Sequence, residues 1–487
     1  MKKLNLGLIG AGMVLMPAMA QAFVSGSTGA DGAFSPTVNT QVVLPPSGIL
    51  NYTTVNIPAG VTVTFKKNAT NTPVVILASG NVTVAGTIWL GGGNATATGA
   101  AGDGALGDDG IPGTGGPGGY DGGRGGMGTL TAPAWTVGGV GLGPGGGKGG
   151  VYYPGVCFCG GGGGGFGIAG ANNRAGTNWA VASTGGAGGA AYGSSQLLPL
   201  IGGSGGGGGV GNVYNGGGGG GGGGAILIAS SGTVNVSGTI GADGGLGGAA
   251  SGANLGGSGG GGAGGAIRIV ATTISGNGTL VARGNAEGAN DNYWWSGGTG
   301  GSGRIRLEAE TFTRTAASTP GHTQGLPGPV FVAGLPTLSI ASVGGVAVPA
   351  QPTGNADVTL PATTPNPVTV SFATTGVPAG NTVRLTLTPA NGAETTVVSP
   401  ALVGDTTSAT ASVNITLPNG PSTLMATVTY NIVLAMGDAL SVYAQGERVE
   451  KITLATALGS KESTVTLITV SGKEYVVPAG VLAAMPV

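Results

Sequence analysis

The chain has 487 residues, of which 111 are glycine, and charged residues make up only 7% of it. Its formal net charge is −1 and it has no basic run, which argues against nucleic acid as a partner. Glycine follows no strict Gly-X-Y period, which excludes collagen, and no segment beyond the N-terminus approaches the roughly 18 consecutive apolar residues of a membrane-spanning helix.

The first 22 residues have the pattern of a secretory signal peptide. Lys2 and Lys3 precede an apolar core over residues 4–16, and Ala20-Gln21-Ala22 is a cleavage motif of small residues. The apolar core is shorter than the roughly 20 residues that span a bilayer. We therefore expect cleavage after Ala22 and export to the outer cell surface, the extracellular space or the periplasm, without a transmembrane anchor.

Residues 23–90 contain short runs rich in β-branched residues, such as VTVTF and PVVILAS, which predict β-strands. A cassette of two short apolar runs followed by glycine starts at Pro73. Further copies start at Gly224, Gly265 and, truncated, Gly303. Because one copy can bury its apolar face only against its neighbours, the repeat predicts a parallel β-solenoid with long glycine-rich excursions.

The glycine-rich region with its cassettes covers residues 91–313 and includes nine consecutive glycines, Gly216–Gly224. Disordered linkers are one interpretation of such sequence. Polyglycine II helices are another: they have three residues per turn, and their backbone groups hydrogen-bond between helices. Isolated apolar residues and a tryptophan pair within the tracts favour ordered polyglycine II, but both interpretations stay open.

Calcium-binding turns are a third interpretation of the glycine tracts. The candidate ligands are four aspartates beside glycine, Asp103, Asp108, Asp109 and Asp243. They lack the nonapeptide spacing of calcium β-rolls, and Asp-Gly is above all a turn signal. We therefore expect no cofactor, with calcium as the weak alternative.

The signal peptide, the opening GADGAFSPTVNT, the cassettes GGAGGAIRIVA and GGSGRIRLEAE and the β-rich tail resemble exported glycine-rich proteins of Gram-negative bacteria. The resemblance covers residues 26–313. Such proteins are treated as cell-surface or matrix components, so the resemblance implies a surface or matrix role. In composition, the tracts are also similar to the polyglycine II sandwiches of some phage tail-tip adhesins and of a springtail antifreeze protein, although the Gly-Gly-X period is irregular here.

The remaining residues have three parts. Residues 314–335 form a linker rich in Pro and Gly, and residues 336–435 contain about seven short strands, the pattern of an Ig-like β-sandwich without its inter-sheet disulfide. Residues 436–487 predict a small C-terminal β unit with a turn at Ser471-Gly472. This unit is either a terminal hairpin or an anchoring or assembly signal.

Cys157 and Cys159 are the two cysteines of the chain. In an exported protein they favour a disulfide across one residue, because side chains at i and i+2 share a face of an extended chain. Free thiols or an intermolecular pair remain alternatives. A zinc site is disfavoured because zinc needs four ligands and no histidine lies nearby.

Enzyme chemistry has little support in the sequence. The single histidine, His322, lies in the linker, and Glu308 and Glu310 share one strand face without an opposing acid. Cleavage of a glycosidic bond needs two carboxyl groups on either side of that bond. We therefore predict a non-enzymatic protein, with a polysaccharide-active enzyme as the least favoured alternative.

Surface binding is the more natural interpretation, because aromatic residues gather in the glycine tracts. Exposed aromatic side chains on rigid loops stack on sugars or anchor a partner, whereas buried ones would fill gaps in a glycine bundle. The candidate binding residues are Tyr152, Tyr153, Trp179, Tyr293, Trp294 and Trp295, and Trp135 and Tyr214 belong to the same group.

The sequence thus predicts an exported structural or adhesive protein of the bacterial cell surface or extracellular matrix. A lectin-like module that binds carbohydrate or another surface is the alternative. The expected partners are other surface or matrix components, polysaccharide, or further copies of the chain.

Overall fold

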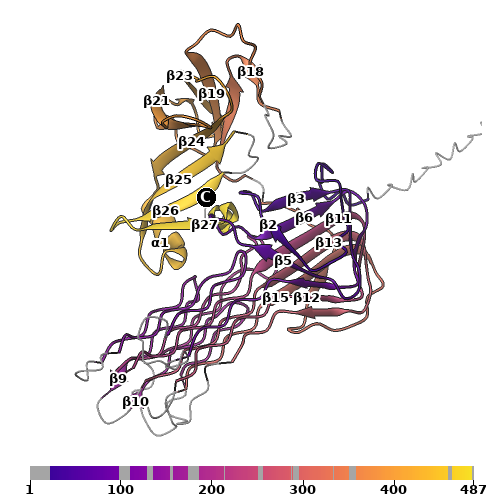
Figure 1. Ribbon diagram of the computed structural model, residues 1–487, viewed down its shortest axis with the longest axis vertical. Coiled ribbons are helices and arrows are strands. Elements are labelled where there is room, and N and C mark those ends of the chain that lie inside the picture. Colours follow the sequence, from indigo (N-terminus) through magenta and orange to yellow (C-terminus); the bar gives the residue numbers. More distant parts are fainter. Residues whose placement is uncertain are drawn as a thin grey trace, which may run out of the picture.

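A computed structural model describes residues 22–97, 110–128, 135–153, 157–173, 186–212, 214–250, 256–286, 288, 296–332, 334–349, 358–458 and 463–484. The described chain is almost entirely β structure, so the all-β prediction is confirmed. Figure 1 shows a body of stacked parallel strands, a bundle of extended glycine-rich segments that leaves this body, and a C-terminal unit of antiparallel strands.

The stacked-strand body consists of strands from four stretches of the chain, 22–90, 225–241, 266–281 and 304–325. Its strands are β1 (Ala33–Phe34), β2 (Thr40–Val43), β3 (Ile49–Tyr52), β4 (Thr54–Ile57), β5 (Thr62–Lys66), β6 (Val74–Ala78), β7 (Val82–Val84), β8 (Thr87–Trp89), β11 (Ala225–Val236), β12 (Thr239–Gly241), β13 (Ala266–Ser275), β14 (Thr279–Val281), β15 (Arg304–Phe312) and β16 (Thr323–Gly325).

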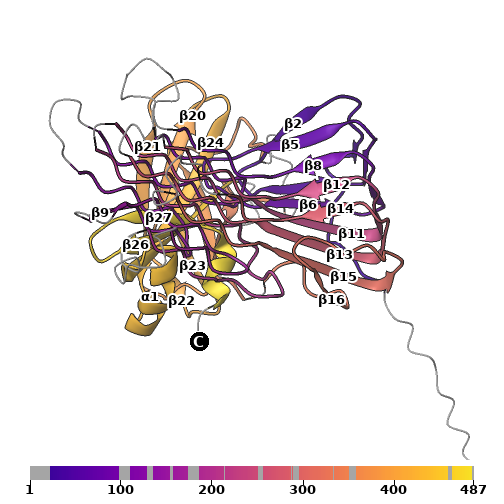
Figure 2. The same ribbon diagram turned by 90° about the horizontal axis from the view of Figure 1, so that it is seen from below.

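All strand pairings in this body are parallel (Figure 2), and β11 and β13 stay aligned on either side of an irregularity between Ser230 and Thr233. The long strand β11 pairs with both β6 and β7, then with β13, which pairs with β15. A second sheet has the order β14-β12-β8-β5-β2. The four cassettes contribute β6, β11, β13 and β15, so the repeat in the sequence corresponds to hydrogen-bonded neighbours in space.

Apolar side chains stack in columns inside the body. Val74, Ile226, Ile267 and Ile305 occupy one register position on four successive strands, and all four are buried. Alternate residues of each strand face this core because side chains in a strand alternate between faces. Burial of such side chains holds the body together, at about 1.5–3 kcal/mol for each fully buried Val or Ile.

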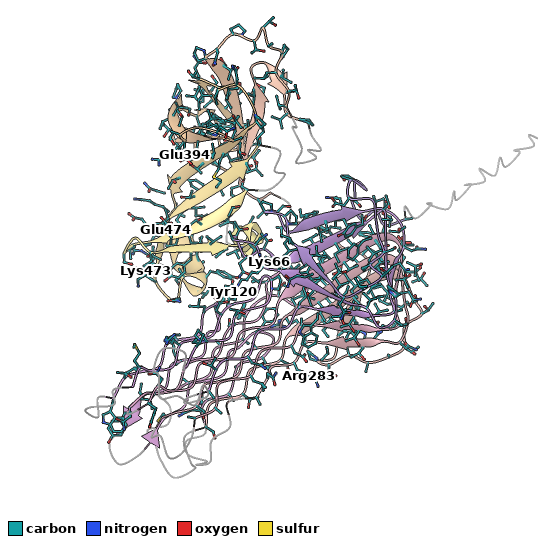
Figure 3. The ribbon with its side chains drawn as sticks, viewed as in Figure 1. Lys66, Tyr120, Arg283, Glu394, Lys473 and Glu474 are labelled. Atoms are coloured by element: carbon teal, nitrogen blue, oxygen red, sulfur yellow. The ribbon has the colours of Figure 1, made fainter. Side chains whose placement is uncertain are left out.

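The glycine bundle contains the excursions between β8 and β11, between β12 and β13, and between β14 and β15. Its segments run side by side away from the body. Their described residues form no helix or strand other than the short antiparallel pair β9 (Tyr152–Tyr153) and β10 (Cys157–Phe158). Figure 3 shows sparse side chains along the bundle next to the densely filled body. Backbone groups therefore make most of its contacts.

The run Gly216–Gly224 is buried, and each of its nine N–H groups donates to a carbonyl of another segment at 2.8–3.2 Å. Every third residue uses the same neighbour. Gly216, Gly219 and Gly222 donate to residues 120–126, and the two residues after each of them donate to residues 257–263 and 90–96 in turn.

The carbonyl groups of the same run accept from three further segments, residues 113–116, 203–209 and 245–248. The run thus has six neighbours around it. These neighbours provide the partners that the buried backbone groups of the run require. The segments 160–165, 203–210 and 257–264 are buried in the same way, and with Gly216–Gly224 they form the inner segments of the bundle.

The glycine positions of the inner segments leave no space for a side chain. A Cβ atom added at Gly217, Gly219 or Gly221 would lie within 3.0 Å of backbone atoms of a neighbouring segment. None of the glycines of Gly216–Gly224 has a positive φ, whereas the reversals between segments use glycines such as Gly118 and Gly143, with φ of 77° and 94°. Glycine is therefore required by close approach inside segments and by conformation at the turns.

The C-terminal unit, residues 334–484 as far as described, has two antiparallel sheets, with orders β18-β17-β19-β23-β22 and β21-β20-β24-β25-β26-β27. Its elements are β17 (Thr337–Val343), β18 (Val346–Ala347), β19 (Val368–Thr375), β20 (Thr382–Pro389), β21 (Thr395–Ala401), β22 (Val403–Gly404), β23 (Ala409–Ile415), β24 (Ser422–Asn431), α1 (Leu434–Leu440), η3 (Ser441–Tyr443), β25 (Val449–Ala457), β26 (Thr464–Thr469), β27 (Glu474–Val477) and η4 (Ala479–Ala484).

One apolar core joins both sheets of this unit and includes residues on both sides of position 436. Strands β25–β27 extend the sheet that contains β24, because β24 pairs with β25 over seven residue pairs. The boundary expected between residues 435 and 436 therefore lies inside one packed unit. The expected turn at Ser471-Gly472 is present, with φ of 83° at Gly472 and a hydrogen bond from its N–H to the Thr469 carbonyl.

Candidate functional site

The end of the glycine bundle farthest from the stacked-strand body is the candidate binding surface, and we call it the tip (Figure 1). Several segments reach the same level there. The N–H of Thr136 donates to Gly211, Gly128 donates to the Asn215 side chain at 2.6 Å, and Cys159 donates to Val151. Backbone hydrogen bonds along the segments thus fix the positions of the chain at the tip.

Two aromatic rings stack at the tip. The centroids of Trp135 and Tyr152 lie 3.8 Å apart with an interplanar angle of 15°, and both side chains are half-buried. Tyr152 belongs to β9, which places it opposite Phe158 of β10. The pair forms a flat apolar element of the kind that binds sugar rings or anchors a partner protein.

The outer segments present one side chain in every three residues. In the segment YDGGRGGMG, Asp121, Arg124 and Met127 point outward, and the glycines between them are buried. On the adjacent outer segment, Val137 and Val140 do the same. Met127 is 58% exposed and Val137 is 64% exposed, so the part of this face nearest the tip is apolar.

Cys159 is buried and disulfide-bonded. The chain has only two cysteines, and β10, which contains Cys157, pairs with β9. Of the other predicted binding residues, Tyr153 is described through its backbone in β9. Trp179, Tyr293, Trp294, Trp295, Asp103, Asp108 and Asp109 lie outside the described residues.

The described residues that flank these aromatic segments are hydrogen-bonded to other residues of the bundle. Asn173 donates from its N–H to Gly186 at 2.8 Å, and these two residues flank the segment that contains Trp179. Gly288 donates to Gly259, beside which Gly297 also lies, and these two flank Tyr293–Trp295. Sequence reasoning selected the aromatic residues, but it could not predict the contacts of the residues that flank them.

The remaining calcium candidate, Asp243, has its carboxylate engaged by a single residue. The backbone N–H of Arg283 donates to one oxygen at 2.6 Å, and the Arg283 guanidinium donates to the other at 2.9 Å. Both oxygens are therefore used within the bundle. Among the described residues, no group of three or more His, Cys, Asp or Glu side chains has the arrangement of a metal site.

Glu308, one of the two acids considered for catalysis, lies in a buried ion cluster. Its side chain is 3% exposed and pairs with Arg268, which is 1% exposed, at 3.0 Å, and with Arg306 at 3.2 Å. Burial raises the pKa of Glu308, but the hydrogen bonds and charge of Arg268, with smaller contributions from Gly328 and Arg306, outweigh it and hold the pKa below its usual value.

The cluster fastens the linker to the body. The Glu308 carboxylate also accepts the N–H of Gly328 at 2.8 Å, and Arg268 donates to the carbonyl groups of Pro329 and Val330. Sequence reasoning missed both arginines. The available signal was an arginine at the same cassette position in GAIRIVA and GRIRLEA.

Glu310 and His322 have other partners. Glu310 accepts the N–H of Phe23 at 2.7 Å. The His322 ring is within hydrogen-bonding distance of the Ser318 hydroxyl and the Gln324 amide, and burial, with the nearby charge of Arg314, lowers its pKa. These contacts do not assemble a pair of opposed acids. The Ser318 hydroxyl and the His322 ring are as close as a nucleophile and its base, but the second ring nitrogen of His322 contacts the Gln324 amide and not a carboxylate.

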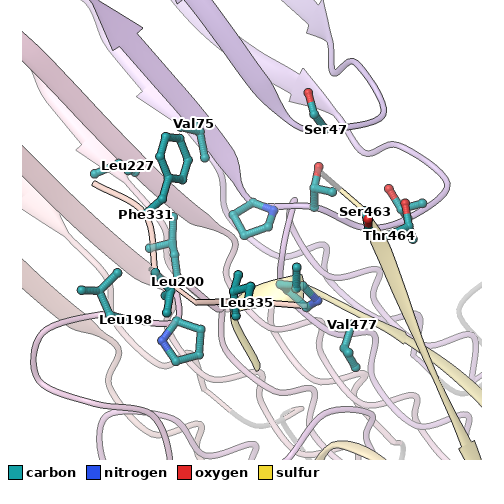
Figure 4. Close-up of a pocket in the computed structure, with 18 of the residues that line it drawn as sticks. Ser47, Val75, Leu198, Leu200, Leu227, Phe331, Leu335, Ser463, Thr464 and Val477 are labelled. Atoms are coloured by element: carbon teal, nitrogen blue, oxygen red, sulfur yellow. The ribbon is translucent and has the colours of Figure 1, made fainter. Parts of the chain in front are cut away.

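A small cavity of about 120 Å³ lies where the body meets the C-terminal unit (Figure 4). Its lining combines Val75 and Leu227 of the body, Phe331 of the linker and Val477 of β27, and none of the residues that line it is titratable. The cavity is therefore an apolar junction between two packed units. It lacks the acid or base that a catalytic pocket needs.

Within the part of the chain that the structure describes, no helix combines the length and hydropathy needed to cross a bilayer. No protein-family model, curated protein or solved structure matches this chain.

Proposed function

We propose that this chain is an exported, non-enzymatic structural or adhesive protein of the bacterial cell surface or extracellular matrix, with the bundle tip as its contact surface. The observation that carries the proposal is the hydrogen-bonded packing of the inner segments. Six neighbours surround Gly216–Gly224, so the tip lies at the end of a support that has few ways to deform.

In this proposal, the stacked-strand body is a parallel β-solenoid, the bundle is a set of polyglycine II helices, and the C-terminal unit is an Ig-like module extended by β25–β27. The three-residue period of the hydrogen bonds supports polyglycine II, which has three residues per turn. In-register parallel strands support the solenoid, and two antiparallel sheets around one core support the Ig-like module.

A rigid support suits a contact surface because ordering costs are met during folding and not during binding. The tip combines the Trp135–Tyr152 stack with the exposed Met127 and Val137 side chains. Tryptophan and tyrosine are among the residues that supply most of the binding energy at protein interfaces. Export supplies the setting in which such a surface meets matrix polymers or other cells.

Carbohydrate binding is the second candidate function, and the Trp135–Tyr152 stack favours it. Half-buried aromatic faces stack against the apolar faces of sugar rings. The ligand class would then be a polysaccharide of the cell surface or matrix.

A binding assay separates these functions. The protein that begins at Phe23 is tested on a glycan array and on isolated bacterial envelopes, together with Trp135→Ala and Tyr152→Ala. The matched control is Trp89→Ala, because Trp89 is a 39% exposed tryptophan of the body. We expect both tip variants to lose at least about tenfold in affinity, as loss of an aromatic anchor does, and the control to bind normally.

Glycan binding with loss in the tip variants would favour the lectin-like function, and envelope binding without glycan binding would favour protein adhesion. Binding that the tip variants retain in full would remove the tip from the proposal. Export is tested separately by N-terminal sequencing of the protein outside the cytoplasm, with Phe23 as the expected first residue.

A further inference from the structure

The segment that begins at Phe23 lies across the ends of several strands of the body. The Ser25 hydroxyl donates to the Ala78 carbonyl of β6 at 2.7 Å, and its N–H donates to Ser231 of β11 at 3.0 Å. Ser27 donates to the Tyr52 carbonyl of β3. Residues 23–27 therefore bind three successive strands of the stack.

Phe23 is fixed at both its side chain and its backbone. Its ring packs against an apolar cluster on the outer face of the sheet, which includes Val75, Leu227 and Val270. Its backbone nitrogen lies 2.7 Å from a carboxylate oxygen of Glu310, on β15 at the other end of the stack. The first residue after the predicted cleavage position thus has a defined place on the body.

The other charged side chains on the neighbouring strands have partners other than Glu310. The other charged residues on β13 and β15 are Arg268, Arg304, Arg306 and Glu308. Arg268 and Arg306 both pair with Glu308, and Arg304 donates to the carbonyl of Tyr192. Among the described residues, Glu310 takes part in no ion pair with a side chain, and its assigned contact is the nitrogen of Phe23.

We infer that removal of residues 1–22 creates an α-ammonium group at Phe23 that forms an ion pair with Glu310, so that processing itself completes the fastening of the stack. This inference rests on the proposed export. A signal peptidase would hydrolyse the Ala22–Phe23 peptide bond with one water molecule. The products are a carboxylate on Ala22, which departs, and an ammonium on Phe23, which stays 2.7 Å from Glu310.

The ion pair raises the pKa of the α-ammonium, because a nearby carboxylate favours the charged form. An α-amino group ordinarily titrates at about 7.7–8.0. The stabilisation is therefore fully present below about pH 7.7, provided that Glu310 is ionised, and it is lost as the pH rises through the raised pKa of the folded state.

The direct test measures the pKa of this amine. Protein that begins at Phe23 is prepared by cutting a fusion in vitro, and the amine is titrated by NMR in the wild-type protein, in Glu310→Gln and in Glu474→Gln, a control with the same substitution on β27. We expect an elevated pKa in the wild-type and control proteins, and a value in the ordinary range in Glu310→Gln. The same pKa in all three proteins would overturn the inference.

A second measurement separates the charge from the hydrogen bond. Acetylation of the α-amine keeps an N–H donor at Phe23 but removes the positive charge. At pH 6.5 we expect the acetylated protein to have a folded-to-unfolded ratio lower by about two- to fivefold, the usual range for an exposed ion pair. Above about pH 10 the two forms should be equally stable. Equal stability at both pH values would contradict the ion pair.

Both measurements use protein cut in vitro, so their outcome does not depend on export. If cells release a protein whose first residue is not Phe23, the proposed processing fails while the measured pairing stands. If Phe23 is the first residue but its pKa is ordinary, export stands and the ion pair fails.

Discussion

The stacked-strand body and the glycine bundle alternate along one chain, but side chains hold the body together, whereas backbone groups hold the bundle together. In the body, columns such as Ile226, Ile267 and Ile305 fill the space between sheets. In the bundle, the interior is mostly glycine backbone, and hydrogen bonds join neighbouring segments, as between Gly219 and Gly123. One architecture gains from hydrophobic burial, and the other gains from backbone hydrogen bonds at close approach.

The difference explains where glycine is needed. Inner segments contain nearly unbroken glycine runs, such as Gly216–Gly224 and residues 160–165, because any Cβ would meet a neighbouring backbone. Outer segments keep a side chain at every third position, as at Asp121, Arg124 and Met127. These outward side chains lie on the surface of the bundle.

Substitution of an inner glycine should have the largest effect. In Gly219→Val the branched side chain would overlap the backbone of residue 206, so the segments must separate and lose their hydrogen bonds. We expect a loss of more than about 4 kcal/mol, in the range of the most disruptive single substitutions. Denaturant unfolding measures it, with Gly321→Val as the control, because a Cβ at Gly321 would have open space. A normal midpoint for Gly219→Val would contradict close packing of the inner segments.

Substitution of Arg268 should cause the second-largest loss of stability. Arg268→Ala leaves the buried Glu308 without its main partner and frees the linker from the body. Removal of one member of a buried pair costs about 3–5 kcal/mol. Thermal unfolding of Arg268→Ala is compared with that of Arg384→Ala, on β20 of the C-terminal unit, and a loss that is equally small in both would mean that the cluster does not fasten the linker.

A cavity in the body should cost somewhat less. Ile228 is fully buried in the core of the body, and Ile→Ala substitutions at such sites cost about 2–5 kcal/mol. The two regions differ most for small changes. Ile228→Val should cost only about 0.5–1.5 kcal/mol, whereas no small side chain is tolerated at Gly219. If a small substitution at Gly219 lowered stability no more than Ile228→Val does, the body and the bundle would not differ in how they are packed.

Acidification should produce the smallest effect. The pKa of Glu308 is lower in the folded protein than its ordinary value near 4.5, so the cluster stabilises the fold above that value. The contribution is lost as the pH falls below about 4.5 through the folded-state pKa. The free energy of unfolding, measured between pH 3 and pH 6, should show this loss. The slope of that free energy against pH should be smaller in Glu308→Gln. An unchanged slope in that variant would assign the acid sensitivity to other groups.

The sequence predicted the neighbours within the body well, because each cassette carries the same short pattern and identical patterns pair in register. The ladder of Val74, Ile226 and Ile267 follows from that alignment. The C-terminal boundary was harder to predict. The higher share of charged residues after position 435 suggested a separate unit, but β25 pairs with β24 and continues the sheet.

The arrangement of the bundle could not be predicted from local pattern. Glycine carries no side chain that identifies its neighbour, and Gly219 binds Gly123, about a hundred residues earlier in the chain. The distinction between unbroken and interrupted glycine runs was nevertheless present in the sequence, and it corresponds to inner and outer segments. Likewise, the aromatic residues were visible, whereas the stack of Trp135 on Tyr152 required two segments to be placed side by side.

Amide hydrogen exchange over Gly216–Gly224 measures whether the inner segments are held by hydrogen bonds, because all nine N–H groups donate to other segments. We predict exchange slower by about a hundredfold or more than that of an unstructured glycine peptide, comparable to the protection of β11, and loss of this protection in Gly219→Val. Exchange at the rate of an unstructured peptide would contradict the account and make the run a flexible tether.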